Sequence, residues 1–324
     1  MDSVSTYHQI LQTHFSASLT PNSPKSLYEP VDYIMQLGGK RMRPVLALLG
    51  CELFGGNTDD AIHAAKAIEI FHNFSLVHDD IMDDAPLRRG HETVHEKWNM
   101  VTAILSGDVM VFLAYENLLK YPTNQAKMLI ELFTNTGREV CEGQQWDMDF
   151  EKMEQVSLTD YLNMIRCKTA VLLGASLQMG AIVAAASEES QKYLYDFGIE
   201  LGLAFQILDD YLDAFGDPAT FGKQVGGDII ANKKTYIFIK ALALANVEQA
   251  QQLTHLFAIE PADPTDKINT VKQLFTETGA VIETRKAIEQ HTQNALSLLQ
   301  KLDIDQEKKQ LLEAFSLQLM GREV

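Results

Sequence analysis

The chain has 324 residues, of which 46% are hydrophobic and 22% are charged. This balance supplies enough apolar side chains for a sizeable core and excludes disorder throughout the chain. Lysine and arginine total 27 against 44 aspartate and glutamate, so the net charge of −17 disfavours nucleic acid and anionic lipid as partners. The three cysteines are widely spaced and form neither a zinc-binding pattern nor a disulfide framework, which is typical of a reducing compartment.

No segment of the sequence reads as a targeting or membrane segment. The opening residues, MDSVSTYHQI, lack the basic region and apolar core of a secretory signal. The most apolar stretch, residues 170–186, is interrupted by Ser176 and Gln178 and falls short of the about 18 apolar residues of a membrane span. We therefore predict a buried helix there, and a cytoplasmic protein without stable membrane insertion.

Proline and glycine divide the chain into helical segments. Breakers occur, in chain order, near residues 22–24, 38–39, 55–57, 85–86, 215–218 and 225–228. None of the nine prolines lies between Pro122 and Pro218 or after Pro264, which leaves room for long helices. From Tyr193 to Leu208 the apolar residues recur at steps of three and four, and we find neither alternating strands nor a long internal repeat. The sequence predicts an all-α protein with one core and a single domain over residues 1–324.

Two acidic motifs stand out. Residues 79–83 and 209–213 both read Asp-Asp-x-x-Asp, whereas 22 aspartates in 324 residues give about 0.1 such pattern by chance. On a helix, residues four apart share a face, so Asp79 and Asp83 point to one place and Asp80 lies to the side. The apolar flanks make clustered carboxylates costly unless a cation binds them. Mg²⁺ takes oxygen ligands of this kind together with substrate phosphates.

Basic residues accompany both acidic motifs. Lys40-Arg41-Met42-Arg43 follows a Gly-Gly pair, Arg88-Arg89-Gly90 follows the first motif, and Lys223 and Lys233-Lys234 follow the second. Arginine forks and lysine point charges both bind diphosphate. The sequence therefore predicts one site for a Mg²⁺–diphosphate and another that binds a diphosphate directly.

At these motifs the chain resembles the trans-isoprenyl diphosphate synthases, also called polyprenyl synthetases. The resemblance runs from GGKRMRP at residue 38 to NKKT near residue 235. It includes LVHDDIMDDAPLRRG, EGQQWDMD, Lys168-Thr169, FQILDDYLD and FGKQVGGDI. It implies an isoprenoid synthase-type helical barrel around a deep cavity, usually homodimeric. It also implies a prenyltransferase that condenses isopentenyl diphosphate with an allylic diphosphate.

The resemblance also assigns residues. Three Mg²⁺ ions would be held by Asp79, Asp80, Asp83, Asp209, Asp210 and Asp213. The allylic diphosphate would be contacted by Arg88, Lys168, Lys223 and Lys233. The diphosphate of isopentenyl diphosphate would be bound by Lys40, Arg43, His72 and Arg89. Near the reacting carbons would lie Thr169 and Gln206. More peripheral roles would fall to Asp84, which extends the first motif, to Asp228, which supports a closing loop, and to Arg322, which covers the pocket.

Product length is expected to depend on the residues preceding the first motif. Phe74 lies five residues before Asp79, about 7 Å down a helix, and Ser75 follows it. An aromatic residue followed by a small one, with no insertion in the motif, resembles the archaeal-type geranylgeranyl synthases. We expect a C20 product, with C15 as the alternative; Phe74 could also simply be a core residue.

Three other functions remain open from the sequence. Terpene cyclases share the fold and a first acidic motif, but they usually replace the second motif and lack the second diphosphate site. A non-catalytic subunit of a heteromeric synthase would tend to lose acidic ligands, and none is lost here. A Ca²⁺-binding structural protein would need a loop pattern that this sequence does not contain. We expect His78 to pack rather than bind metal, and Gln144 and Asp147 to support the site.

Overall fold

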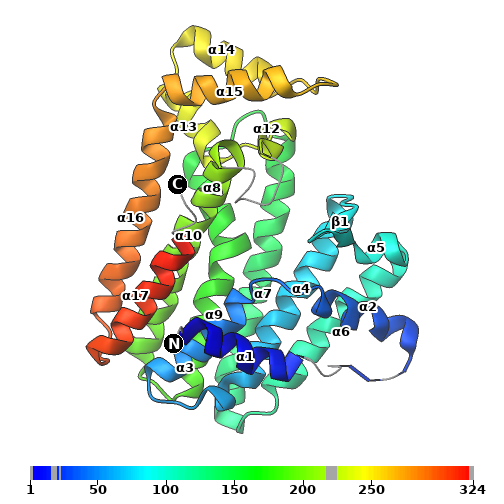
Figure 1. Cartoon of the computed structure of the whole chain (residues 1–324), viewed down its shortest axis with the longest axis vertical. Coiled ribbons are helices and arrows are strands. Elements are labelled where there is room, and N and C mark those ends of the chain that lie inside the picture. Colours follow the sequence, from blue (N-terminus) through cyan, green and yellow to red (C-terminus); the bar gives the residue numbers. More distant parts are fainter. Residues whose placement is uncertain (1–2, 16–19, 22, 217–224, 321–324) are drawn as a thin grey trace. The chain divides into compact units, whose positions relative to one another are not determined.

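The structure is a computed structural model that describes residues 3–15, 20–21, 23–216 and 225–320. Nearly all regular structure is helical (Figure 1). The first helices and a short hairpin are α1 (Ser3–Phe15), α2 (Lys25–Gln36), α3 (Met42–Leu53), η1 (Thr58–Ala61), α4 (Ile62–Met82), β1 (Leu87–Arg88), β2 (His91–Glu92), α5 (Val94–Lys97) and α6 (Met100–Leu118). The remaining helices are α7 (Thr123–Lys152), α8 (Leu158–Ile165), η2 (Arg166–Ala170), α9 (Val171–Val183), α10 (Glu188–Phe215), α12 (Gly227–Ile230), α13 (Tyr236–Leu244), α14 (Val247–Leu256), α15 (Thr265–Glu277), α16 (Ala280–Gln300) and α17 (Gln306–Met320).

The chain forms two compact units that alternate along the sequence. The first unit comprises residues 1–135, 175–194 and 303–311, and the second comprises 136–174, 195–302 and 312–324. The predicted all-α class is confirmed, because β1 and β2, of two residues each, are the strands of the described part of the chain. The single domain over residues 1–324 stays a prediction.

The first unit is built around α4. This helix packs against α3 and α6, and α2 packs against α4 and α6. Ile68 of α4 and Leu48 of α3 are fully buried. A Cβ at Gly180, in the second half of α9, would clash with the carbonyl oxygen of Ala47, so glycine is required where α9 crosses α3. This packing fixes the C-terminal end of α4, where the first acidic motif lies.

The second unit is built around α10. One side of α10 buries Leu208 and Leu212 against α13 and α15, and another side buries Leu203 and Ile207 against α8. Asp209, which lies between these two apolar sides, is half-buried. The helical periodicity of α10 therefore leaves Asp209 and Asp213 on the face that the two cores do not use.

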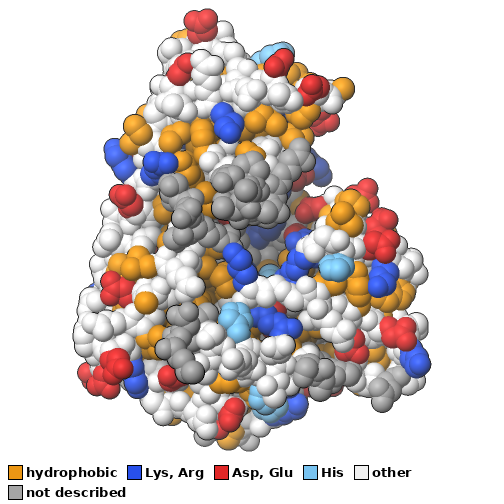
Figure 2. Space-filling model, viewed as in Figure 1, with side chains coloured by type: hydrophobic (Ala, Val, Ile, Leu, Met, Phe, Trp, Pro, Cys, Tyr) orange, Lys and Arg blue, Asp and Glu red, His pale blue; other side chains and the backbone are white. Residues whose placement is uncertain are grey.

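One helix of the described residues, α6, is long and apolar enough to cross a membrane, and 39% of it is buried. It packs against α2, α4 and α5. The apolar stretch at residues 170–186 forms the buried helix α9, as predicted. On the face that Figure 2 shows, acidic side chains are spread out, including over the surface of α14 and α15. The cytoplasmic location stays a prediction.

Candidate active site

The first acidic motif lies at the C-terminal end of α4. Asp79 and Asp80 are in the last turn, and the Asp83 amide donates to the Asp79 carbonyl at 2.9 Å. The predicted one-turn spacing of Asp79 and Asp83 is therefore present. The breaker at residues 85–86 predicted a helix that runs to Asp84, but α4 ends at Met82, and Asp84 adopts a left-handed φ of 49°. Carboxylates at a helix C-terminus are repelled by the helix dipole, which favours a bound cation.

Asp80 differs from its neighbours because it is fully buried. The Arg88 guanidinium donates two hydrogen bonds to Oδ1 of Asp80, one from Nε at 2.9 Å and one from Nη2. Burial raises the pKa of Asp80, while Arg88 opposes that shift. The other oxygen, Oδ2, is buried with no hydrogen-bond partner among the described residues. Asp80 thus anchors Arg88 and leaves one oxygen that suits a nearby cation.

The Arg-Arg-Gly segment forms the turn of the hairpin β1–β2. Arg88 pairs with His91, while Arg89 and Gly90 have positive φ values of 54° and 78°, as a type I′ turn requires. This turn sends the two guanidiniums to different partners. Arg88 reaches Asp80, whereas Nη1 of Arg89 donates to the carbonyl oxygen of Gly38. The two adjacent arginines therefore contact two different segments of the first unit, the end of α4 and the loop at Gly38.

A second cluster forms where α3 meets α4. Arg43 Nη1 lies 3.2 Å from His72 Nε2, and burial together with the neighbouring arginines lowers the pKa of His72 well below its usual value. Neutral His72 therefore accepts this hydrogen bond. Burial also lowers the pKa of Arg43, to about 10, while Glu69 opposes the shift. Lys40 follows the Gly38-Gly39 pair that Arg89 contacts. The predicted residues Arg43 and His72 thus lie together, and Arg89 reaches the segment beside Lys40.

Glu69 was not singled out from the sequence. It is buried, it is held by Asn73 Nδ2 at 3.3 Å, and burial raises its pKa against the influence of Arg43, Arg41 and Arg89. Its carboxyl group therefore lies in the field of these arginines. The sequence could have indicated Glu69, because it is a single acidic residue in the apolar helical segment AIEIF. A buried acidic residue of this kind needs a polar or charged partner.

The second acidic motif occupies the last two turns of α10. Asp210 is buried, and both of its oxygens have partners. Tyr161 of α8 donates its hydroxyl to Oδ2, and Gln206 Nε2 donates to Oδ1 at 3.1 Å. Burial and the charge of Asp228 raise the pKa of Asp210 well above its usual value. As in the first motif, the middle aspartate is internal, whereas Asp209 and Asp213 are half-buried.

Asp213 organises the segment that follows α10. Its Oδ2 accepts from the backbone amide of Asp228 at 3.0 Å. The carbonyl of Asp228 in turn accepts from the amide of Lys233 at 2.9 Å. Lys234 Nζ donates to the carbonyl oxygen of Phe150 at 3.1 Å, so it is directed to α7. Two predicted residues, Lys223 and Arg322, lie outside the described residues.

Lys168 and Thr169 lie in η2, a π-helical turn between α8 and α9. Such turns often occur at functional sites because they redirect side chains. Lys168 Nζ donates to Asp147 Oδ2 at 2.5 Å, and Thr169 Oγ1 donates to Gln206 Oε1 at 3.1 Å. The structure therefore brings Thr169 and Gln206 together, and it gives Asp147 the supporting contact that the sequence suggested.

Phe74 belongs to an aromatic cluster in the first unit. Its ring is half-buried, with centroids 5.3 Å from Phe71 and 4.9 Å from His78. Phe71 in turn packs against Phe133 of α7 at 5.1 Å. Ser75 Oγ donates to the carbonyl oxygen of His72. His78 packs on Phe74 and lies 3.1 Å from the carbonyl oxygen of Ile104, in agreement with its predicted packing role.

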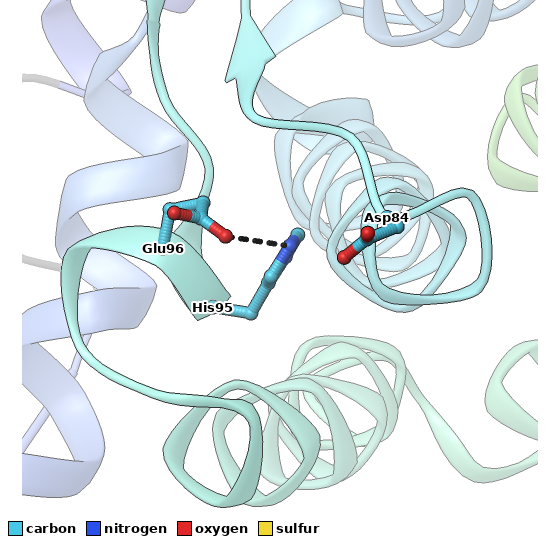
Figure 3. A group of neighbouring side chains, drawn as sticks. All are labelled: Asp84, His95 and Glu96. Carbon is cyan, nitrogen blue, oxygen red and sulfur yellow. Dashed lines mark ion pairs between the residues drawn. The ribbon is translucent and has the colours of Figure 1, made fainter.

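A small mixed cluster lies beside the first motif. Figure 3 shows His95 of α5 between Asp84 and Glu96, with Glu96 Oε1 3.7 Å from His95 Nε2. The three ligand atoms lie within 4.8 Å of one another, and both carboxylate residues are exposed. Both His95 nitrogens are buried and lack a hydrogen-bond partner among the described residues. The left-handed backbone of Asp84 directs its carboxylate to this cluster.

The amino-acid sequence of the chain matches a known protein family. A model of the polyprenyl synthetase family matches residues 24–275. The chain belongs to the polyprenyl synthetase family. A crystal structure of a geranylgeranyl pyrophosphate synthase matches it with a TM-score of 0.96 and 48% identity, covering 100% of both chains.

Two relatives extend the comparison to named products. The geranylgeranyl pyrophosphate synthase of Geoglobus acetivorans is 38% identical over 297 residues, 91% of each chain. The geranylfarnesyl diphosphate synthase of Natronomonas pharaonis is 33% identical over 329 residues, 94% of this chain and 92% of the relative. The polyprenyl synthetase described here is therefore a prenyltransferase with the all-α fold of the isoprenyl synthases.

Proposed function

We propose that this polyprenyl synthetase makes geranylgeranyl diphosphate by condensing isopentenyl diphosphate with allylic diphosphates, in a Mg²⁺-dependent head-to-tail reaction. The observation that carries this proposal is the pair of acidic motifs, each with two aspartates one helical turn apart at a helix C-terminus. The names of the relatives at 38–40% identity support the C20 product.

The donor set fits Mg²⁺, because each motif offers only carboxylate oxygens. We assign direct metal contact to Asp79, Asp83 and Asp209, and to Oδ2 of Asp80, because Arg88 holds only the Oδ1 atom of Asp80. Both oxygens of Asp210 already accept hydrogen bonds, from Tyr161 and Gln206. Asp213 also belongs to the metal set, although its carboxylate caps the segment at Asp228. Bound Mg²⁺ would neutralise charge on the leaving diphosphate, with three ions as the expected number.

The resemblance to the family divides the basic residues between two proposed diphosphate sites. Arg88, Lys168, Lys223 and Lys233 would contact the allylic diphosphate. Lys40, Arg43, His72 and Arg89 would bind isopentenyl diphosphate. The hairpin turn supports this division, because it sends Arg88 to Asp80 and Arg89 to Gly38. Guanidinium forks suit diphosphate oxygens in both sites.

The reaction begins when the allylic C–O bond breaks and the electron pair leaves with the diphosphate. The double bond of isopentenyl diphosphate attacks the resulting cation, and a proton then passes to the departed diphosphate. Thr169 and Gln206, joined by a hydrogen bond, would orient oxygen dipoles to the cation without capturing it. Exclusion of water would protect the cation.

Metal removal tests the proposed chemistry directly. Purified protein incubated with isopentenyl diphosphate and an allylic diphosphate is expected to form product with Mg²⁺ and to lose all activity after EDTA treatment. Added Mg²⁺ should restore the rate, because the carboxylate pairs stay folded in α4 and α10. Turnover that persists in EDTA would overturn the proposal, and cyclised hydrocarbon products would favour a terpene cyclase.

The half-buried ring of Phe74 is proposed to limit the growing prenyl chain. Phe74→Ala removes the ring that packs on Phe71 and His78, so the products are expected to lengthen by one or more C5 units. Mass spectrometry of the dephosphorylated alcohols measures this shift. Ile282→Ala, at an exposed position of α16, is the control. An unchanged product distribution would show that Phe74 is only a core residue.

The homodimer is proposed from an apolar stripe on α6. Val101, Leu105 and Phe112 are 74%, 56% and 67% exposed, and their spacing places them on one helix face. Such a patch on a globular protein marks an interaction surface. Phe112→Asp is expected to convert a dimer to a monomer in light scattering, whereas Val247→Asp, at a 77% exposed position of α14, should leave the dimer intact. A wild-type monomer would contradict the proposal.

A further inference from the structure

A buried lysine lies in the second unit outside the predicted site. Lys267 of α15 is 3% exposed. Its Nζ donates to Asn232 Oδ1 at 2.6 Å, to the Ile259 carbonyl oxygen at 3.0 Å and to the Ile230 carbonyl oxygen at 3.4 Å. These three acceptors match the three donors of an ammonium group. A buried charge requires such complete satisfaction, so the contact is specific.

Two of the three acceptors of Lys267, on Ile230 and Asn232, belong to the turn that precedes Lys233, and the third lies between α14 and α15. Ile230 ends α12, and Asn232 has a left-handed φ of 57°. The next amide, that of Lys233, donates to the carbonyl of Asp228 at 2.9 Å. Lys267 therefore holds the side chain of the residue whose backbone sets the direction of Lys233. Few non-glycine residues adopt this conformation without a local stabilising contact.

The opposite side of this turn is anchored to the second acidic motif. Asp213 Oδ2 accepts from the amide of Asp228, and its carbonyl accepts from the amide of Gly226 at 2.6 Å. The segment from Gly226 to Lys233 is thus fixed at one end by a residue of the motif and at the other by Lys267. Removing either anchor would let Lys233 move relative to Asp213.

We propose that Lys267 is a positioning residue that holds the Asn232 turn and so places Lys233 for binding of the allylic diphosphate. The inference rests on the proposed function, in which Lys233 contacts that diphosphate. Lys267 itself is buried under the turn and touches backbone and amide oxygens, so it acts only through Lys233. A displacement of about 1 Å at a binding group can lower activity by up to about 100-fold.

Steady-state kinetics with separate KM values for the two substrates tests this proposal. Lys267→Met is expected to raise the KM for the allylic diphosphate about tenfold and to leave the KM for isopentenyl diphosphate within about twofold. A general loss of folded protein would lower the rate without this split. Lys286→Met, at an exposed position of α16, is the matched control and should behave as wild type.

A double-mutant cycle separates positioning from an independent effect. Lys233→Ala should raise the same KM at least as much, and Lys267→Met combined with Lys233→Ala should be no worse than Lys233→Ala alone. Additive effects would overturn the proposal, as would a normal allylic KM in Lys267→Met. If Lys233→Ala itself is silent, the assigned role of Lys233 fails, and that result identifies the proposed function as the source of the error.

Asn232→Gly provides a second route if Lys267→Met does not fold. Glycine adopts the left-handed conformation but removes the amide oxygen that Lys267 holds. The allylic KM is expected to rise in the same direction and by a smaller factor, because the backbone contacts of Lys267 remain. An unchanged allylic KM in folded Asn232→Gly would also count against the proposal.

Discussion

Asp79→Asn is expected to lower kcat/KM by about 10³-fold while the protein stays folded. Asp79 is half-buried in the last turn of α4, one turn from Asp83. Asparagine keeps the shape but removes the charge that holds a cation. Metal stabilisation of a leaving diphosphate amounts to several kcal/mol, and about 4 kcal/mol corresponds to that factor. Initial rates with saturating Mg²⁺ measure the loss.

The matched control for Asp79→Asn is Asp59→Asn, the same change at an exposed position in η1. It should keep wild-type rates and the wild-type melting temperature. Circular dichroism establishes that both variants are folded. An Asp79→Asn protein within about threefold of wild type would remove Asp79 from the metal site and contradict the assignment of the first motif.

Arg43→Gln should raise the KM for isopentenyl diphosphate by about 100-fold. Arg43 lies 3.2 Å from His72 in a buried cluster with Glu69, where the low dielectric strengthens its attraction for an anion. Loss of a desolvated charged contact costs about 2–5 kcal/mol, and about 2.7 kcal/mol is 100-fold. The KM for the allylic substrate should change much less, since its proposed ligands are other residues.

Arg41→Gln is the matched control, because it removes a neighbouring positive charge whose guanidinium contacts other residues than His72. Its guanidinium lies over the Phe15 ring at 4.7 Å and donates to the Met35 carbonyl oxygen at 3.4 Å. We expect less than a threefold change in either KM. Equal effects of the two substitutions would indicate that net positive charge, and not a site at Arg43, determines binding.

The features that depend on local helical periodicity could be predicted from the sequence. The absence of proline between residues 122 and 218 predicted the long helices α7 and α10, and both are present. The four-residue spacing of Asp79 and Asp83 predicted a shared face, and the amide-to-carbonyl bond between them shows that turn. Helical geometry repeats every 3.6 residues, so such features can be read without knowledge of the fold.

The features that depend on distant contacts could not be predicted. Nothing in the local sequence indicates that Tyr161 binds Asp210, 49 residues later, or that Arg88 reaches back to Asp80. As a result, all six aspartates received the same role from the resemblance, as ligands of Mg²⁺. The structure separates Asp80 and Asp210, which are internal, from the i,i+4 pairs that lie around them. The short hairpin was also missed, because two-residue strands give no alternating pattern.

The product length tests the central claim most directly. Purified protein would be incubated with isopentenyl diphosphate, Mg²⁺ and, in turn, the C5, C10 and C15 allylic diphosphates, and the dephosphorylated alcohols would be resolved by mass. We predict a C20 alcohol as the endpoint from all three starters. A C15 endpoint would make the enzyme a farnesyl diphosphate synthase. Products of C25 or longer, or no condensation at all, would contradict the geranylgeranyl assignment.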